Sequence, residues 1–129
     1  MVVKKSMLEQ INKLFETSDD IRYVAIYDRG ELFSRVRSNL GDSSAAESNK
    51  YEELLVNPAI LTLAGQRGDI DCGGCRFVVV RYGNFYQFVK AMPTGHVSVC
   101  IALGADIFAL SQMLYDSIVA SFQKSVTAV

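Results

Sequence analysis

Three short apolar segments separated by two turn signals constrain this chain more than any other feature of its sequence. The segments are residues 76–82, 85–92 and 96–103. Gly83-Asn84 is a two-residue hairpin signal between the first two segments, and Pro93-Thr94-Gly95 breaks the run before the third. We therefore expect an antiparallel meander of three strands that leads directly into a final helix.

The remaining elements surround this meander. Apolar residues at helical spacing predict an amphipathic helix over residues 3–17, and residues 21–27 and 31–36 form a second predicted hairpin around Asp28-Arg29-Gly30. For the middle of the chain, Asn57-Pro58 favours a helix that begins at Pro58, with Asn57 as its cap and a short turn over residues 51–56 before it. The last helix is expected over residues 105–122.

This order of elements predicts one α+β domain over residues 1–129, with a five-stranded antiparallel sheet in the order α-ββ-α-βββ-α. Both pleat faces of residues 76–82 and 85–92 are substantially apolar, so helices should cover both faces, with the middle helix alone on one of them. A helix about 10 Å wide cannot cover a sheet of about 20 Å, so we expect a partner chain there. Residues 38–50 are polar and without periodicity, and we expect an exposed loop.

Composition excludes several classes of function. With 13 basic and 14 acidic residues the net charge is -1, which gives no electrostatic reason to expect nucleic acid or an anionic membrane as partner. The apolar runs are too short for a membrane span, and the N-terminus lacks the apolar region of a signal peptide. We expect a cytoplasmic protein without membrane insertion.

The sharpest chemical motif is Cys72-Gly73-Gly74-Cys75. Two thiols at this spacing could form a redox disulfide or hold half of a metal site; alternatively, the glycines make a turn and the cysteines are small buried residues. A four-ligand zinc site with His96 and Cys100 is not expected. Those two residues are four apart on one strand, about 13 Å, and their strand should lie two places from the one that follows Cys75. Cys100 is expected in the core and His96 near the surface.

Catalytic signals are missing from the sequence. It has no phosphate-binding glycine loop, no Gly-x-Ser-x-Gly and no carboxylate pair placed with a histidine for nucleophilic catalysis. We therefore predict no catalytic residue, no metal, no cofactor and no enzymatic activity. Glu52-Glu53 is expected to be a solvated pair of charges near a helix N-terminus.

Nearly the whole chain resembles the roadblock family, small domains found in dynein light chains and in regulators of Ras-like GTPases. The resemblance lies in the element order, the hairpin IRYVAIYDRGELFSRV, the middle helix NPAILTLAGQRG, the meander RFVVVRYGNFYQFVKAMPTGHVSVCIAL and the closing helix. It implies a homodimer that pairs the middle helices and continues the sheet through residues 76–82. The interface residues implied are Ile60, Leu61, Leu63, Ala64, Arg76, Val78, Val80 and Tyr82.

Some family dimers bind a small GTPase, and others are adaptors without activity. The resemblance therefore implies a non-enzymatic dimeric interaction module that acts as an adaptor or regulator of a small Ras-like GTPase. A second hypothesis comes from the Cys72/Cys75 turn, which would suit a small-molecule, redox or metal sensor.

Overall fold

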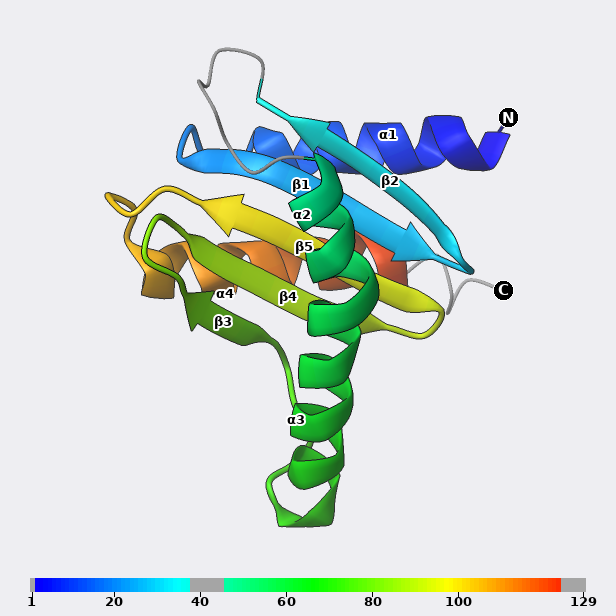
Figure 1. Ribbon diagram of the computed structural model, residues 1–129, viewed down its shortest axis with the longest axis vertical. Coiled ribbons are helices and arrows are strands. Elements are labelled where there is room, and N and C mark those ends of the chain that lie inside the picture. Colours follow the sequence, from blue (N-terminus) through cyan, green and yellow to red (C-terminus); the bar gives the residue numbers. More distant parts are fainter. Residues whose placement is uncertain (1, 38–45, 124–129) are drawn as a thin grey trace.

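Five strands form one antiparallel sheet in the computed structural model, which describes residues 2–37 and 46–123 (Figure 1). The strands are β1 (Ile21–Asp28), β2 (Glu31–Val36), β3 (Val78–Arg81), β4 (Tyr86–Met92) and β5 (Gly95–Ile101). Their order across the sheet is β2-β1-β5-β4-β3, so β5 is central and β3 lies at one edge. The predicted fold class and the meander are confirmed, although the edge strand is shorter than expected.

Helices cover both faces of this sheet, as predicted. α1 (Val2–Phe15) and α4 (Ile107–Ile118) lie on one face, and α4 continues into a π-helical turn, η2 (Val119–Gln123). The Asp106 side chain caps α4 by accepting a hydrogen bond from the Ala109 amide at 3.2 Å. The middle helix crosses the opposite face and extends past the β3 edge, so its far end stands clear of the sheet (Figure 1).

The apolar core lies between the sheet and the helices α1 and α4. Ile11 and Leu14 from α1 and Leu114 and Ile118 from α4 are at most 2% exposed, as their helical spacing predicts. They pack in one cluster with the buried strand residues Ile21, Val24, Ile26, Phe88, Val97, Val99 and Ile101. Phe108, which the pattern placed on a second apolar stripe of this helix, is instead 87% exposed.

The opposite face differs from the sequence-based expectation because it is not uniformly apolar. Gln87, His96 and Ser98 are each at most 2% exposed on this face, beneath the middle helix. The Gln87 amide donates to the Ser98 hydroxyl. Buried polar side chains are stable only when they have partners, so this face of the sheet has a role beyond apolar packing.

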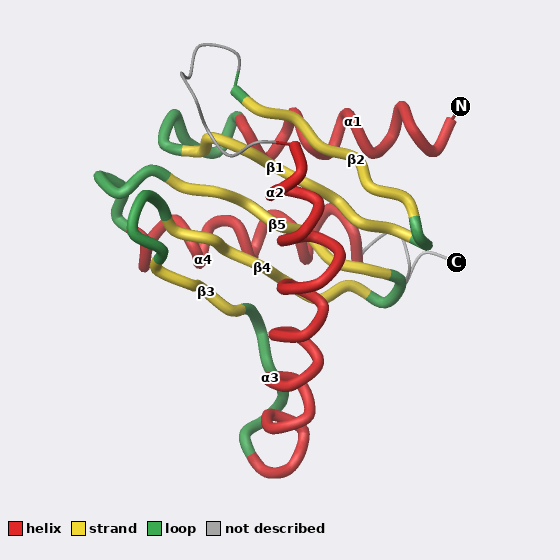
Figure 2. The backbone as a smooth tube through the Cα atoms, in the orientation of Figure 1, coloured by secondary structure: helices red, strands yellow, loops and turns green. Residues whose placement is uncertain are grey.

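The middle helix begins earlier than the sequence predicted and runs without a break. It consists of α2 (Ala46–Tyr51), the π-helical turn η1 (Glu52–Val56) and α3 (Asn57–Asp71), a single coil in Figure 2. Residues 46–50 of the predicted loop are therefore helical, while its residues 38–45 lie outside the described part of the chain.

Asn57 is not a cap, because its own backbone is helical at φ -62 and ψ -45. Its amide bonds to the Glu52 carbonyl five residues earlier, and the wider π-turn accommodates the ring of Pro58, which has no amide to donate.

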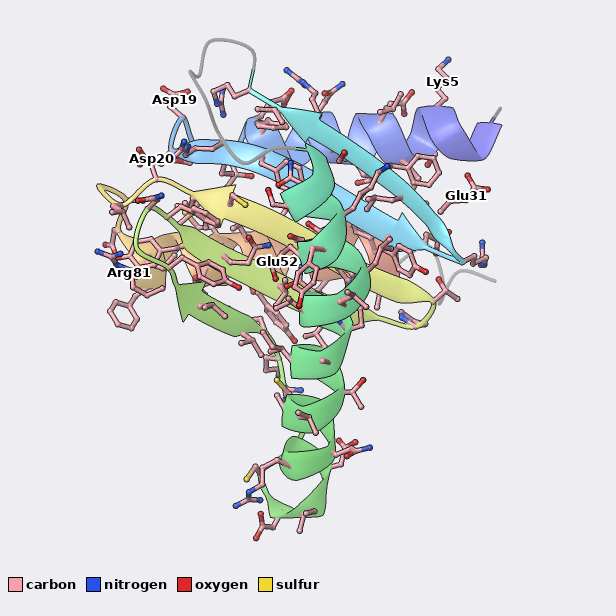
Figure 3. The ribbon with its side chains drawn as sticks, viewed as in Figure 1. Lys5, Asp19, Asp20, Glu31, Glu52 and Arg81 are labelled. Carbon is pink, nitrogen blue, oxygen red and sulfur yellow. The ribbon has the colours of Figure 1, made fainter. Side chains whose placement is uncertain are left out.

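Charged side chains mark the outside of the fold, with one exception. Lys5, Asp19, Asp20 and Arg81 are exposed at its periphery, whereas Glu52 lies between the middle helix and the sheet (Figure 3). None of the helices in residues 2–37 and 46–123 has the length and apolar character needed to cross a lipid bilayer.

Candidate functional site

The eight residues of the predicted dimer interface fall on α3 and on the edge strand β3 with its flanks. Leu63 is 67% exposed, and Arg76 is also exposed. The other six are half-buried: Ile60, Leu61, Ala64, Val78, Val80 and Tyr82. Val78 and Val80 lie on the sheet face beneath the middle helix, as their alternation with the core-facing Val79 predicts. The interface itself stays a prediction.

The middle helix carries further exposed apolar side chains that the sequence analysis did not select. Tyr51 is 62% exposed, Leu54 47%, Leu55 57% and Ile70 75%. Leu63 and Ile70 are seven residues apart, two helical turns, and so share a face. Residues 51–71 alone contain five of the ten large apolar side chains that are exposed among the described residues. Such a concentration on one helix is typical of a binding surface.

Cys72 and Cys75 lie just beyond the end of α3, and both are exposed. The alternative that they are buried residues is therefore wrong, but the glycines make the turn as expected. Gly73 and Gly74 have φ of 78° and 86°, a conformation that residues with a Cβ rarely adopt. The Cys72 thiol donates to Asp71 Oδ1 at 3.3 Å, and the Arg67 guanidinium holds the pKa of that carboxyl below its usual range.

A buried polar cluster lies where the middle helix crosses β5. Glu53 Oε1 is 2.8 Å from His96 Nε2 and accepts a hydrogen bond from Asn57 Nδ2 at 2.9 Å. Glu53 and Asn57 are 0% exposed and His96 is 2% exposed, with the Tyr27 ring stacked against the imidazole at 5.6 Å. The expectations of a surface histidine and of a solvated Glu53 are thus both wrong.

One signal in the sequence could have located this cluster. Glu53 and Asn57 are four residues apart, and Asn57 is four residues before Leu61, which helps line a small pocket that His96 also borders. Residues at this spacing share one face of a helix. Extending the apolar stripe of α3 backwards by two such steps would therefore have placed both polar residues against the sheet.

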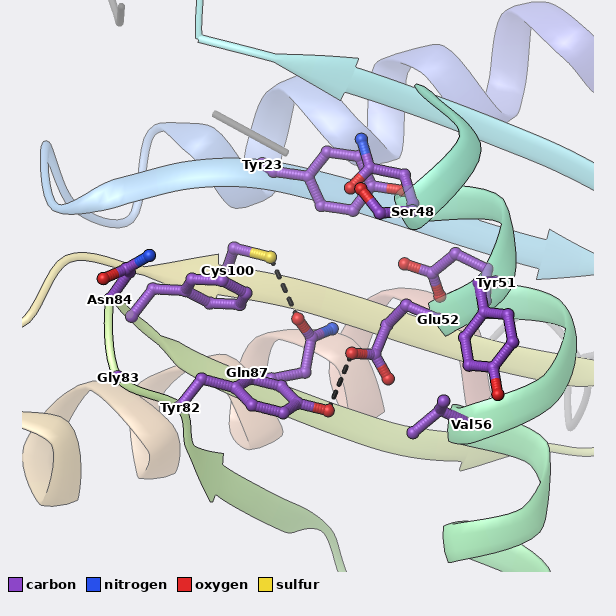
Figure 4. A pocket seen from close by; sticks show the side chains of 13 residues that line it. Tyr23, Ser48, Tyr51, Glu52, Val56, Tyr82, Gly83, Asn84, Gln87 and Cys100 are labelled. Carbon is purple, nitrogen blue, oxygen red and sulfur yellow. Dashed lines mark hydrogen bonds between the residues drawn. The ribbon is translucent and has the colours of Figure 1, made fainter. Parts of the chain in front are cut away.

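Next to this cluster, a cavity of about 440 Å³ lies between the middle helix and the sheet (Figure 4). Its wall comes from the middle helix, β1, β4, β5 and the β3–β4 turn. The lining residues are Tyr23, Ser48, Asn49, Tyr51, Glu52, Glu53, Val56, Tyr82, Gly83, Asn84, Phe85, Gln87 and Cys100.

Two hydrogen bonds organise the cavity wall. The Tyr82 hydroxyl donates to Glu52 Oε1 at 2.8 Å, and the Cys100 thiol donates to Gln87 Oε1 at 3.0 Å (Figure 4). Burial raises the pKa of Glu52 against the opposing effect of the Tyr82 hydroxyl, and burial beside Glu52 raises the pKa of Tyr82 to about 12.

Cys100 is half-buried rather than fully in the core. Burial, and next the Glu53 charge, raise the pKa of its thiol, so it remains protonated at neutral pH and is a poor nucleophile. It belongs to the cavity wall and not to the Cys72/Cys75 turn, which lies beyond the end of α3 (Figure 1). Residues 2–37 and 46–123 contain no group of three or more His, Cys, Asp or Glu side chains suited to a metal ion.

Known proteins resemble this chain in structure but not in sequence. Neither a protein-family model nor a curated protein matches it. The gliding protein MglB of Thermus thermophilus matches with a TM-score of 0.64 at 10% identity, over 93% of this chain and 90% of that one. A structure described as MglB with tetrameric arrangement gives the same values.

A Roadblock/LC7 domain from Streptomyces avermitilis matches with a TM-score of 0.62 at 17% identity, over 85% of this chain and 92% of that chain. At these identities the similarity establishes architecture alone. The order of elements, the antiparallel sheet and the placement of its helices agree over most of both chains, and the chain therefore has the fold of the roadblock family.

Proposed function

We propose that this chain is a non-enzymatic interaction module that forms a homodimer and acts as an adaptor or regulator of a small Ras-like GTPase. The observation that carries the proposal is the exposed apolar side of the middle helix, beside the open edge of β3. Leu63 and Ile70 are 67% and 75% exposed on a helix that extends beyond its own sheet. A second copy would remove these side chains from water, which is the main driving force for association.

The edge strand supports the same arrangement. β3 pairs with β4 on one side only, and it lies at the end of the strand order. A strand edge with free backbone groups can pair with the same strand of a second chain and continue the sheet. The comparison structure described as MglB with tetrameric arrangement indicates that this fold supports self-association. The GTPase as partner follows from the resemblance to the family.

The oligomeric state tests the first half of the proposal. Wild-type protein should sediment as a dimer at micromolar concentration, and Leu63→Asp and Ile70→Asp should each weaken the dimer by roughly 100-fold, because a charge is buried in an apolar contact. Phe108→Asp is the matched control, since Phe108 is 87% exposed on α4, on the other side of the sheet. A monomeric wild type, or equal effects of all three substitutions, would refute the proposed interface.

Binding to a GTPase tests the second half. The tagged wild-type protein should retain a small Ras-like GTPase from its own source, identified by mass spectrometry and then confirmed with the purified pair. The chain itself should not bind GTP or GDP. If the purified pair does not associate in either nucleotide state, the GTPase part of the proposal is wrong even if the dimer is real.

The Cys72/Cys75 turn favours a second candidate function, a thiol-based sensor, because both thiols are exposed. Mild oxidation should then protect both cysteines from alkylation together, as measured by mass spectrometry. A Cys72→Ser/Cys75→Ser variant that dimerises and binds the GTPase as the wild type does would leave the interaction module as the better description.

A further inference from the structure

Three buried polar atoms without partners lie around the cavity beneath the middle helix. They are the Tyr23 hydroxyl, Glu52 Oε2 and Glu53 Oε2. Tyr23 is 5% exposed and Glu53 is 0% exposed, so neither side chain is satisfied by bulk water. Native proteins rarely leave such groups unpaired, because each one forfeits its hydrogen bonds to solvent. Their occurrence together in one cavity points to a ligand that supplies the missing partners.

The chemistry of the wall defines that ligand. Two carboxylates contribute unpaired acceptors, and the Tyr23 hydroxyl can accept as well as donate. Glu53 Oε1 is already engaged by His96 and Asn57, and Glu52 Oε1 by Tyr82. Among the described residues that line the cavity, none is Lys, Arg or His. The complement is therefore a positively charged group with several N–H donors.

The rest of the wall indicates an organic cation and not a metal ion. The rings of Tyr23, Tyr51, Tyr82 and Phe85 line the cavity, and aromatic faces attract organic ammonium groups and pack on their alkyl chains. The described residues hold no metal-binding cluster of three or more His, Cys, Asp or Glu. A volume of about 440 Å³ exceeds what a single ion needs and lies in the range of small-molecule sites.

We propose that this cavity binds a small primary amine as its ammonium ion. The ammonium group donates hydrogen bonds to Glu52 Oε2, Glu53 Oε2 and the Tyr23 hydroxyl, and the alkyl portion lies against the aromatic rings. The bound charge offsets the carboxylates, which the sheet and the middle helix otherwise hold out of water. This site is independent of the proposed dimer contact, because its lining includes neither Leu63 nor Ile70.

Titration calorimetry with butylammonium and with butan-1-ol tests the proposal. The two probes have similar carbon chains, but only the first carries the charge. Butylammonium should bind saturably at millimolar concentration or below, and butan-1-ol should bind at least about tenfold more weakly, since charge-assisted hydrogen bonds to buried carboxylates are lost. Equal binding of the two probes, or saturable binding of Ca²⁺ or Mg²⁺ that excludes butylammonium, would overturn the assignment.

Variants locate the binding site. Because Glu53 also holds His96, the informative substitutions are Glu52→Gln and Tyr23→Phe, which preserve shape; each should weaken butylammonium binding, by about tenfold for Glu52→Gln. Glu31→Gln, at an exposed carboxylate on β2, and Tyr115→Phe, on α4, are the matched controls and should bind as the wild type does. Unchanged binding by Glu52→Gln and Tyr23→Phe would show that the amine binds elsewhere.

A final comparison identifies the source of the ammonium group. Nα-acetyl-lysine amide carries the same group as a lysine of a partner protein, whereas butylammonium represents a free metabolite. Competition by the lysine amide with equal or higher affinity would support the site and favour a partner's side chain. Tighter binding of butylammonium alone would support the site and favour a free amine.

Discussion

Removal of His96 should destabilise the fold more than any surface substitution, because it leaves Glu53 buried with only the Asn57 amide as partner. Glu53 is 0% exposed and its Oε1 lies 2.8 Å from His96 Nε2. Removing one partner of a buried charged pair costs about 3 to 5 kcal/mol, and the stacking with Tyr27 adds about 0.5 kcal/mol. For His96→Leu we expect a loss of about 3 kcal/mol, which lowers the Tm by roughly 12 °C.

Urea unfolding followed by circular dichroism, at one fixed protein concentration, measures this loss. The double variant Glu53→Leu/His96→Leu removes both polar groups and should be more stable than His96→Leu alone. Arg67→Gln is the control: it breaks an ion pair of 2.7 Å whose side chains are 64% and 68% exposed, and it should cause no measurable change. If the double variant is as unstable as the sum of the two single variants, the two residues are not coupled and the reasoning fails.

Two further substitutions test the packing and the electrostatics of the middle helix. Gly68→Ala should destabilise the protein by about 1 to 3 kcal/mol, since a Cβ there would lie 2.7 Å from the Gly74 carbonyl carbon, whereas Gly65→Ala meets nothing within 4 Å and should be neutral or stabilising; thermal unfolding compares the two, and equal Tm values would contradict this close packing. Glu52→Gln should change the pH dependence of stability. Because burial raises the pKa of Glu52, the folded state binds this proton more tightly than the unfolded chain. The resulting stabilisation is complete below the unfolded pKa of about 4.3 and is lost as pH rises through the folded value. Wild type should thus lose stability relative to Glu52→Gln across that window, and a difference that does not vary with pH would contradict this reasoning.

Local patterns were sufficient to predict the sheet. Alternating residue types and the turn signals at Gly83-Asn84 and Pro93-Thr94-Gly95 act over a few residues, so the meander and its antiparallel pairing follow from the sequence alone. The apolar spacing of Ile11 and Leu14 likewise identified the side of α1 that packs in the core.

The middle helix shows where local signals fail. Asn57-Pro58 is a strong start signal in isolation, but the helix continues through it because residues distant in sequence hold the preceding turn in place. Tyr82 bonds to Glu52, and His96 bonds to Glu53 across 43 positions of the chain. No periodicity within a single segment reports such a contact, so neither the buried cluster nor the cavity beside it could be predicted from the sequence.

The π-helical turn at Glu52–Val56 sets the angular phase of everything that follows it. A π-turn holds one more residue than an α-turn, and each residue of an α-helix advances the direction of its side chain by about 100°. Deleting one residue there would restore regular winding yet rotate α3 by that angle relative to α2. Either the carboxylates would leave the sheet or Leu63 and Ile70 would turn away from their present direction. The turn thus makes two surfaces with different requirements compatible on one rod, and the inward-facing and outward-facing sides of that rod can change length only together.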